Sequence, residues 1–128
     1  MKKILLDTSI IVDFIRREDK ANTELVKSIK EGYQLSCSII THSELYAGKS
    51  IWEKPEAREE LITILSGIEI LPISETISEQ AGQLKATTQT NLFDALIAAT
   101  ALKRKLTVLT LNSKDFKKIT GLKVKSSI

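Results

Sequence analysis

The chain has 128 residues, of which 42% are hydrophobic and 27% charged, and we expect one soluble globular domain covering residues 1–128. No apolar stretch is long enough to cross a membrane, and the start lacks the apolar core of a signal peptide, so we expect a cytoplasmic protein. One cysteine and one histidine exclude an internal disulfide and a histidine-rich zinc site. Any metal ion must therefore be held mainly by oxygen ligands.

The net charge of +3 is unevenly distributed along the chain. Residues 103–128 carry eight basic and one acidic side chain, whereas residues 1–102 carry 11 basic and 15 acidic ones. A basic region beside an acidic one suits a polyanion that is held at one place and processed by a metal at another. For the charge taken alone, a solvated lysine-rich surface is the favoured explanation.

Apolar periodicity predicts strands and helices that alternate along the chain. The expected strands cover residues 3–6, 33–40, 68–73, 107–111 and 122–125. The expected helices cover residues 9–17, 22–32, 42–50, 55–67, 75–87, 93–105 and 114–119. This alternation predicts an α/β fold with a central, mostly parallel sheet of four to five strands, flanked by helices on both faces.

Acidic residues follow several of the predicted strands. Asp7 follows the first strand, Glu44 follows the second by four residues, Asp94 opens a helix, and Asn112 and Asp115 follow the strand at 107–111. Ligands of open parallel sheets bind outside the carboxyl ends of the strands. The topology is thus expected to bring four acids to one edge.

Each of these acids also has a purely structural interpretation. Asp7 is placed to cap the helix that follows it, Glu44 fits a capping box with Thr41, and Asp94 fits a similar cap with Asn91. Taken singly, each acid is explained by helix capping.

The acids taken together favour a metal site instead. Three or four carboxylates at one edge repel each other, and partial desolvation adds to the cost. A divalent cation offsets this repulsion, and Mg²⁺ prefers oxygen ligands at about 2.0 to 2.1 Å. Asp115 is the weakest member of the set, because the helix dipole alone favours an acid in the first turn of its helix.

Four segments resemble the PIN-domain ribonucleases, specifically the VapC-type toxins of type II toxin-antitoxin pairs. The segments are, in order, "LDTSIIVD", "SIITHSELYAG", "NLFDALIAATAL" and "TLNSKDF", and they extend along the whole chain. Four acidic motifs in this order within a chain of this length are more specific than any one of them. The resemblance implies a PIN fold and a Mg²⁺-dependent endoribonuclease, with Mn²⁺ as a substitute.

The resemblance also assigns roles to individual residues. Asp7 and Asp94 are similar to the principal metal ligands, and Glu44 to the third acid, which holds the metal through water or holds a second ion. Asp115 resembles the fourth acid, which acts directly or through water. Ser9 resembles the small hydroxyl two residues after the first aspartate.

Asn112 occupies the polar position just before the last acid. One segment departs from the family pattern: "TTQTNLFD" is short and lacks the Arg/Gly-containing stretch common before Asp94, which affects RNA positioning and not the metal site.

The resemblance implies hydrolysis of RNA by water, leaving a 5′-phosphate and a 3′-hydroxyl, with Glu44 or Asp115 receiving the proton. A mechanism that uses two histidines is disfavoured because His42 is the only one. The implied partners are the RNA substrate, a cognate antitoxin whose segment covers the acidic pocket with a basic side chain, and a second copy in a homodimer.

Two alternatives remain at this stage. One is a PIN-like module that binds RNA without cutting it. The other is an Mg²⁺-dependent phosphoryl-receiving signalling domain, which fits poorly because Glu44 lies within a helix and Leu111 stands where a lysine is needed.

The few aromatic residues have competing interpretations. We expect Phe93 and Phe116 in the core, and His42 on the surface or in a loop. Tyr46 and Trp52 either contact a partner or pack in the interior.

One helix face and the single cysteine are also open to interpretation. Leu61, Ile62 and Leu65 share a helix face that suits either a groove or dimer surface or the core. Cys37 is expected to be a small buried side chain.

Overall fold

The computed structural model describes residues 2–128. In chain order the elements are β1 (Lys3–Leu6), α1 (Thr8–Arg16), η1 (Lys20–Asn22, a 3₁₀ helix), α2 (Glu24–Lys30), β2 (Gln34–Ser38), α3 (Ile39–Tyr46), α4 (Lys49–Glu53), α5 (Pro55–Leu65), β3 (Glu69–Leu71), α6 (Glu75–Thr88), α7 (Leu92–Arg104), β4 (Thr107–Leu109), α8 (Ser113–Lys117) and β5 (Val124–Lys125). The helices in this part of the chain are each too short or too polar to cross a lipid bilayer.

The predicted elements are confirmed in type, and most of their boundaries shift by one or two residues; two differences are larger. Ile39 and Ile40 belong to α3 and not to the preceding strand, because the Ser38 hydroxyl accepts a hydrogen bond from the Ile40 N–H at 3.1 Å and caps the helix. The helix expected over 42–50 is divided, since α3 ends at Tyr46 and α4 begins at Lys49.

The five strands form one sheet in the order β3-β2-β1-β4-β5, and every neighbouring pair is parallel. This confirms the predicted α/β fold. The chain moves outward from β1 to β2 and β3, then crosses to the other side of β1 for β4 and β5. The order therefore reverses at β1, and the carboxyl ends of β1 and β4 form the topological switch point where ligands bind in such sheets.

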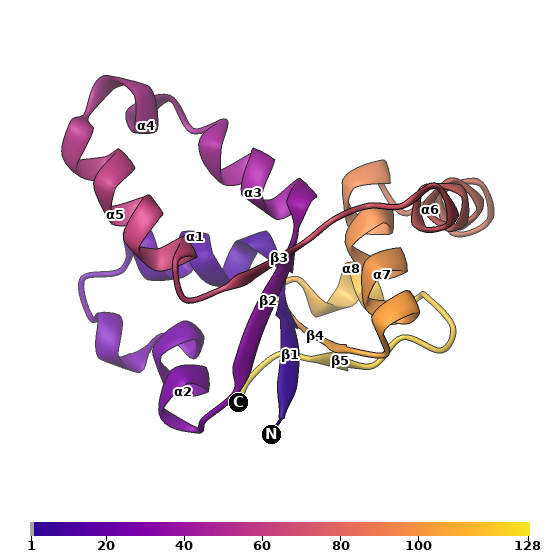
Figure 1. Ribbon diagram of the computed structural model, residues 1–128. Helices are drawn as coiled ribbons and strands as arrows, with labels where there is room; N and C mark the ends of the chain where they lie inside the picture. Colours follow the sequence, from indigo (N-terminus) through magenta and orange to yellow (C-terminus); the bar gives the residue numbers. More distant parts are fainter. Residues whose placement is uncertain (1) are drawn as a thin grey trace.

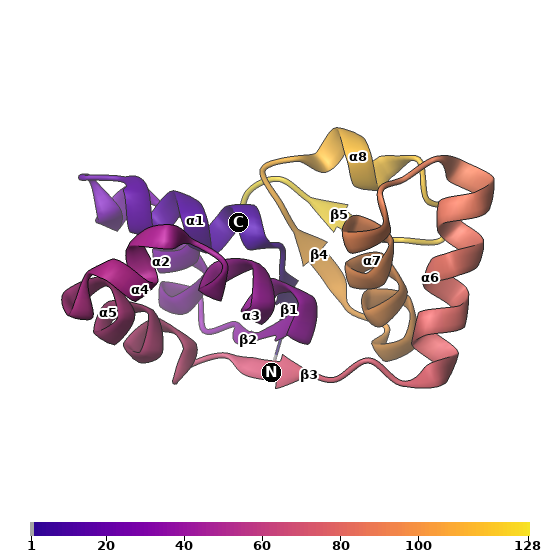
Figure 2. The same ribbon diagram turned by 90° about the horizontal axis from the view of Figure 1, so that it is seen from above.

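Helices cover both faces of the sheet (Figures 1 and 2). Alternate strand residues enter different cores: Ile4 and Leu6 pack with α1 to α5, whereas Leu5 packs with α7 and α8. Helix α6 packs on the outside of α7 through a small apolar cluster made of Ile77, Ala81, Ala95 and Ala99. The cores fix the positions of α1, α3, α7 and α8, which all begin at the carboxyl edge of the sheet (Figure 1).

Candidate metal centre

Asp7 connects β1 to α1 and is only 4% exposed. It occupies the N-cap position of α1, but its side chain makes no capping hydrogen bond. Instead, its Oδ2 atom accepts hydrogen bonds from Ser9 Oγ and Thr110 Oγ1, both at 2.7 Å. The carboxylate is therefore directed at the switch point and not at the end of its own helix, which excludes the capping interpretation of this side chain.

Two backbone amides orient the hydroxyls that bind Asp7. The Leu111 N–H donates to Ser9 Oγ at 3.1 Å, and the Asn112 N–H donates to Thr110 Oγ1 at 2.9 Å. Both hydroxyls then donate to the same oxygen, and no group in residues 2–128 donates to Asp7 Oδ1. Every fully buried side-chain oxygen in residues 2–128 has a hydrogen-bond partner. Since Oδ1 has none, it must be in contact with solvent and is free to accept a ligand.

Glu44 lies on α3, half-buried, and is held from the start of α1. The Thr8 hydroxyl donates to Glu44 Oε1 at 2.7 Å and lies 2.9 Å from Thr41 Oγ1. The predicted capping box with Thr41 is wrong, since α3 begins at Ile39 and Thr41 is already inside the helix. Glu44 is thus placed by a side chain from a different element.

Asp94 lies in the first turn of α7. Its N–H donates to Asn91 Oδ1 and its Oδ2 accepts from Asn91 Nδ2, both at 2.9 Å, so Asn91 is confirmed as the helix cap. Partial burial and the negative charge of Asp7 raise the pKa of Asp94 from 3.8 to about 6, against the lowering effect of Asn91; Asp115 and Glu44 add smaller upward contributions. Asp94 therefore experiences the field of all three other acids.

Asp115 and Asn112 lie exposed at the start of α8. Asn112 occupies the N-cap position without a side-chain cap bond, and its backbone N–H supports Thr110. Asp115 contributes its charge to the field at Asp94.

We call Asp7, Glu44, Asp94 and Asp115 the acidic edge. Within residues 2–128, no three His, Cys, Asp or Glu side chains are already spaced as metal ligands. The donor set nevertheless suits a hard divalent cation, because it is all oxygen, Asp7 Oδ1 is free, and a cation would relieve the repulsion that raises the Asp94 pKa. The residues fit an oxygen-ligated metal that draws the acids together.

The sequence predicted the four acids, Ser9 and Asn112 as site residues but not Thr8 and Thr110, whose hydroxyls bind Glu44 and Asp7. The available signal was a hydroxyl residue after each of two strands, in "LDTS" and "TVLT". Without the pairing of β1 with β4, the sequence does not indicate that Thr110 lies beside Asp7.

Two cavities adjoin the acidic edge between α3 and α7. The larger, of about 370 Å³, is lined by Glu44, Asn91, Leu92, Phe93 and Asp94. The smaller, of about 140 Å³, is lined by Ile40, Ser43, Glu44, Ala47 and Phe93. Both place open space directly beside the acids.

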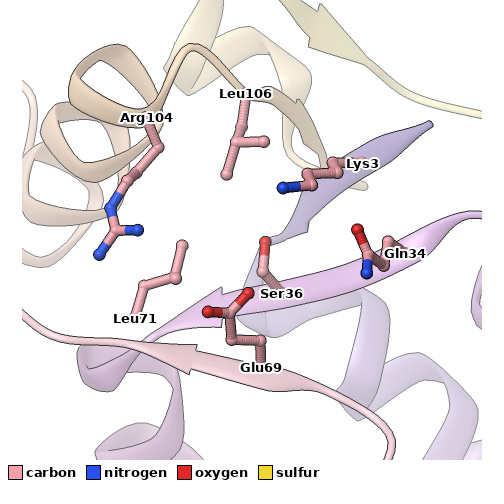
Figure 3. A pocket seen from close by; sticks show the side chains of 7 residues that line it. All are labelled: Lys3, Gln34, Ser36, Glu69, Leu71, Arg104 and Leu106. Carbon is pink, nitrogen blue, oxygen red and sulfur yellow. The ribbon is translucent and has the colours of Figure 1, made fainter. Parts of the chain in front are cut away.

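A different cavity, of about 100 Å³, lies near the amino ends of the strands (Figure 3). Lys3, Glu69 and Arg104 extend into it from β1, β3 and the end of α7, and no ion pair joins them in residues 2–128. Two cations make it unsuitable for a divalent metal. It also lies at the wrong end of the sheet for a switch-point site.

The aromatic residues correct part of the sequence interpretation. Phe116 is confirmed as a core residue with 0% exposure, but Phe93 is 55% exposed, so its placement in the core was wrong. His42 is half-buried on α3, where its ring packs against that of Tyr46 at a centroid distance of 4.8 Å and a tilt of 42°. Trp52 is 65% exposed and donates its indole N–H to the Tyr46 carbonyl at 2.7 Å.

The apolar helix face on α5 is divided between interior and surface. Leu61 is fully buried, Leu65 packs against the core, and Ile62 is 53% exposed. Cys37 is buried as expected.

The sheet order and the position of the acids define the class of protein: a parallel α/β domain with an acidic site at the carboxyl edge. The chain belongs to the PIN-domain family, whose model matches residues 4–122. PIN domains of VapC toxins are nucleases in general, and PIN nucleases generally use divalent metal ions.

Solved structures of toxin-antitoxin complexes contain chains similar to this one. A chain of a toxin-antitoxin complex from Klebsiella pneumoniae is 30% identical with a TM-score of 0.75, and the match covers 98% of this chain and 99% of that one. A chain of VapBC2 from Rickettsia felis, bound to a DNA fragment from their promoter, is 25% identical with a TM-score of 0.77, over 96% and 97%. These matches confirm the resemblance to VapC-type toxins.

A chain of DNA-bound VapBC from Salmonella typhimurium supports the fold alone, at 24% identity and a TM-score of 0.80 over 98% of both chains. A comparison with curated proteins gave no match.

Proposed function

We propose that this PIN domain is a Mg²⁺-dependent endoribonuclease and the toxin of a toxin-antitoxin pair. The observation that carries the proposal is the position of four acids at the switch point of the sheet, where Ser9 and Thr110 hold Asp7 by hydrogen bonds of 2.7 Å. The negative charges of the other three acids repel that of Asp94. A protein that folds with this unrelieved repulsion is suited to bind a cation there.

Asp7 and Asp94 would hold the metal, with Glu44 and Asp115 contributing directly or through water. Bound Mg²⁺, for which Mn²⁺ is expected to substitute, supplies Lewis acidity toward water and the phosphate oxygens. Glu44 and Asp115 are the two candidates to accept a proton from the attacking water.

Three hydroxyls keep the acidic edge in order. Ser9 and Thr110 donate to Asp7 Oδ2 and so leave Oδ1 available, and Thr8 donates to Glu44. These groups are positioning residues, because each acts through a carboxylate and not on the substrate. The predicted products carry a 5′-phosphate and a 3′-hydroxyl.

The proposed partners follow from the family and the similar structures. Those structures are toxin-antitoxin complexes, which supports a cognate antitoxin for this chain as well. We expect an antitoxin segment to cover the acidic edge with a basic side chain that competes with the metal. A homodimer is proposed on the family resemblance, and the exposed side chains of Ile62 and Trp52 are the proposed contact residues between the two copies.

The test uses purified, antitoxin-free protein incubated with total RNA in Mg²⁺, in Mn²⁺ and in chelator. Asp7→Asn and Asp94→Asn are compared with Asp13→Asn, a matched control on α1 whose carboxylate pairs with Arg17 at 4.0 Å. Circular dichroism establishes that all variants are folded. Metal-dependent fragments that vanish in the first two variants and persist in the control support the proposal. Identical RNA patterns in all samples would overturn it.

The sheet order bears on the phosphoryl-receiver alternative. Receiver domains have the strand order 2-1-3-4-5, whereas this sheet has 3-2-1-4-5. The same assay distinguishes the RNA-binding alternative, because a binding module would bind the RNA and leave it uncut.

A further inference from the structure

Phe93 is the exposed aromatic side chain nearest in sequence to the acids of the site. It immediately precedes Asp94 on α7 and is 55% exposed. The residues after Asp94 face the interior instead: Ala95 and Ile97 are fully buried. Leu92, the residue before it, is also 47% exposed and lines the larger cavity with Phe93 and Asp94, so two neighbouring apolar side chains form an exposed surface beside the site.

Phe93 forms a wall of both cavities at the acidic edge. It shares each of them with Glu44, in the cavity of about 370 Å³ and in that of about 140 Å³. The larger cavity also contains Asp94. Open space therefore lies against the ring of Phe93 and against two of the acids at once.

We propose that Phe93 stacks on an unpaired nucleobase next to the phosphate that is cleaved, with the larger cavity receiving that base. This inference rests on the proposed ribonuclease function and adds a residue that determines which nucleotide is held at the site. Sequence-specific recognition of RNA uses unpaired bases stacked on aromatic rings, and every base presents a face to such a ring.

The acids around the cavity favour a base over a phosphate in this position. Glu44 and Asp94 repel a phosphate group that lacks a bridging cation, whereas a neutral base can donate its amino hydrogens to their oxygens. Phe93 supplies the stacking face. The phosphate is expected on the metal side of the acids and the base on the Phe93 side.

Binding is measured first, with Ca²⁺ in place of Mg²⁺, so that a cation bridges the acids and the phosphate while binding does not depend on cleavage. Single-stranded RNA oligonucleotides carry 2-aminopurine at successive positions, and stacking on Phe93 is expected to quench its fluorescence at one of them. Phe93→Ala removes the quenching and weakens binding, whereas Phe93→Trp retains both. Ile29→Ala, which truncates a similarly exposed apolar side chain on α2, is the control and leaves both unchanged.

Cleavage is measured next, with Phe93→Ala, Phe93→Leu and Phe93→Trp. Stacking of one base predicts a rise in KM of roughly 5- to 150-fold for the alanine and leucine variants, with wild-type behaviour for tryptophan. An oligonucleotide with an abasic site at the quenched position is expected to reduce the wild type to the level of Phe93→Ala.

Three results would overturn the proposal. Full activity of Phe93→Leu would indicate simple apolar packing, and unchanged quenching in Phe93→Ala would show that no base stacks on the ring. A Phe93→Ala variant that no longer binds the antitoxin but binds and cleaves RNA like the wild type would assign the ring to the antitoxin. Wild-type protein that binds RNA with quenching but never cleaves it would refute the ribonuclease function and leave the stacking site intact. Wild-type protein that cleaves RNA without quenching refutes the stacking site alone.

Discussion

Thr110 Oγ1 donates a 2.7 Å hydrogen bond to Asp7 Oδ2 across 103 residues of sequence. The contact exists because β4 pairs with β1 in parallel register, so that the residues after the two strands meet at the switch point. A buried carboxylate held in this way keeps its orientation before any metal arrives. Removing the Thr110 hydroxyl should therefore affect both folding and metal binding.

Thr110→Val keeps the shape of the side chain but removes the donor to Asp7. We expect a loss of stability of about 1–3 kcal/mol and a fall in metal affinity of roughly 10- to 100-fold, because residues that orient a metal ligand have effects of this size. Isothermal titration with Mn²⁺ and thermal unfolding measure the two effects.

Thr100→Val is the matched control, since Thr100 is also buried but its hydroxyl binds only the Leu96 carbonyl within α7. It should alter stability and leave Mn²⁺ affinity unchanged. Equal Mn²⁺ affinity in Thr110→Val and the wild type would contradict the positioning role.

The pKa of Asp94, about 6 in the folded protein against 3.8 for an ordinary aspartate, predicts a pH-dependent stability without metal. The folded state binds the proton more tightly than the unfolded state, so this group favours folding at low pH and loses that contribution as pH rises from about 4 to 6. In chelator at pH 7.5, Asp94→Asn should therefore be more stable than wild type, by about 1 kcal/mol once solvent screening of this half-exposed group is included.

Urea unfolding at pH 4 and pH 7.5 measures this difference. The advantage of Asp94→Asn should largely disappear near pH 4, where the wild-type carboxyl is protonated in the folded state and close to half protonated in the unfolded state. Adding Mg²⁺ at pH 7.5 should stabilise the wild type more than the variant. A pH-independent difference between the two proteins would argue against the raised pKa.

The Cys37 side chain is 0% exposed, and this burial raises the pKa of its thiol from 9.0 to about 12. Because the thiolate is the reactive form, we expect no reaction with a thiol reagent in the native protein at pH 8 and complete reaction after denaturation. Following Ellman's reagent with and without guanidinium tests this. Rapid native reaction would indicate that β2 opens.

Three exposed lysines lie next to Asp115 of the acidic edge: Lys114 and Lys117 on α8, and Lys118 just after it. Replacing all three by Gln should raise KM for RNA and reduce the slope of log affinity against log salt by roughly 2, because each phosphate neutralised on a single strand adds about 0.7 to that slope. Fluorescence anisotropy over a range of KCl concentrations provides the slope.

The control carries the same replacements at Lys2, Lys27 and Lys30, which lie before β1 and on α2, toward the amino ends of the strands. The control should retain the wild-type slope. Equal slopes in both triple variants would place the RNA backbone elsewhere.

The elements and their alternation could be predicted from the sequence, because apolar periodicity reports which residues face a core. The sequence also placed Asp7, Asp94 and Asp115 near the ends of strands or the starts of helices, where a parallel sheet gathers its ligands, whereas Glu44 lies near the end of α3. These inferences succeed because they depend on neighbours in the chain and on one rule of topology.

The groups that meet at that edge could not be predicted from the sequence, because strand pairing brings them together. Local sequence placed Asp7 correctly at an N-cap but assigned its side chain to the wrong partner, because Thr110 becomes its neighbour only when β4 pairs with β1. Phe93 was assigned to the core because an apolar residue on a helix usually is, yet α7 turns that position outward and buries Ala95 and Ile97. Contacts between residues far apart in sequence depend on strand order and helix rotation, which the packing of the whole domain sets.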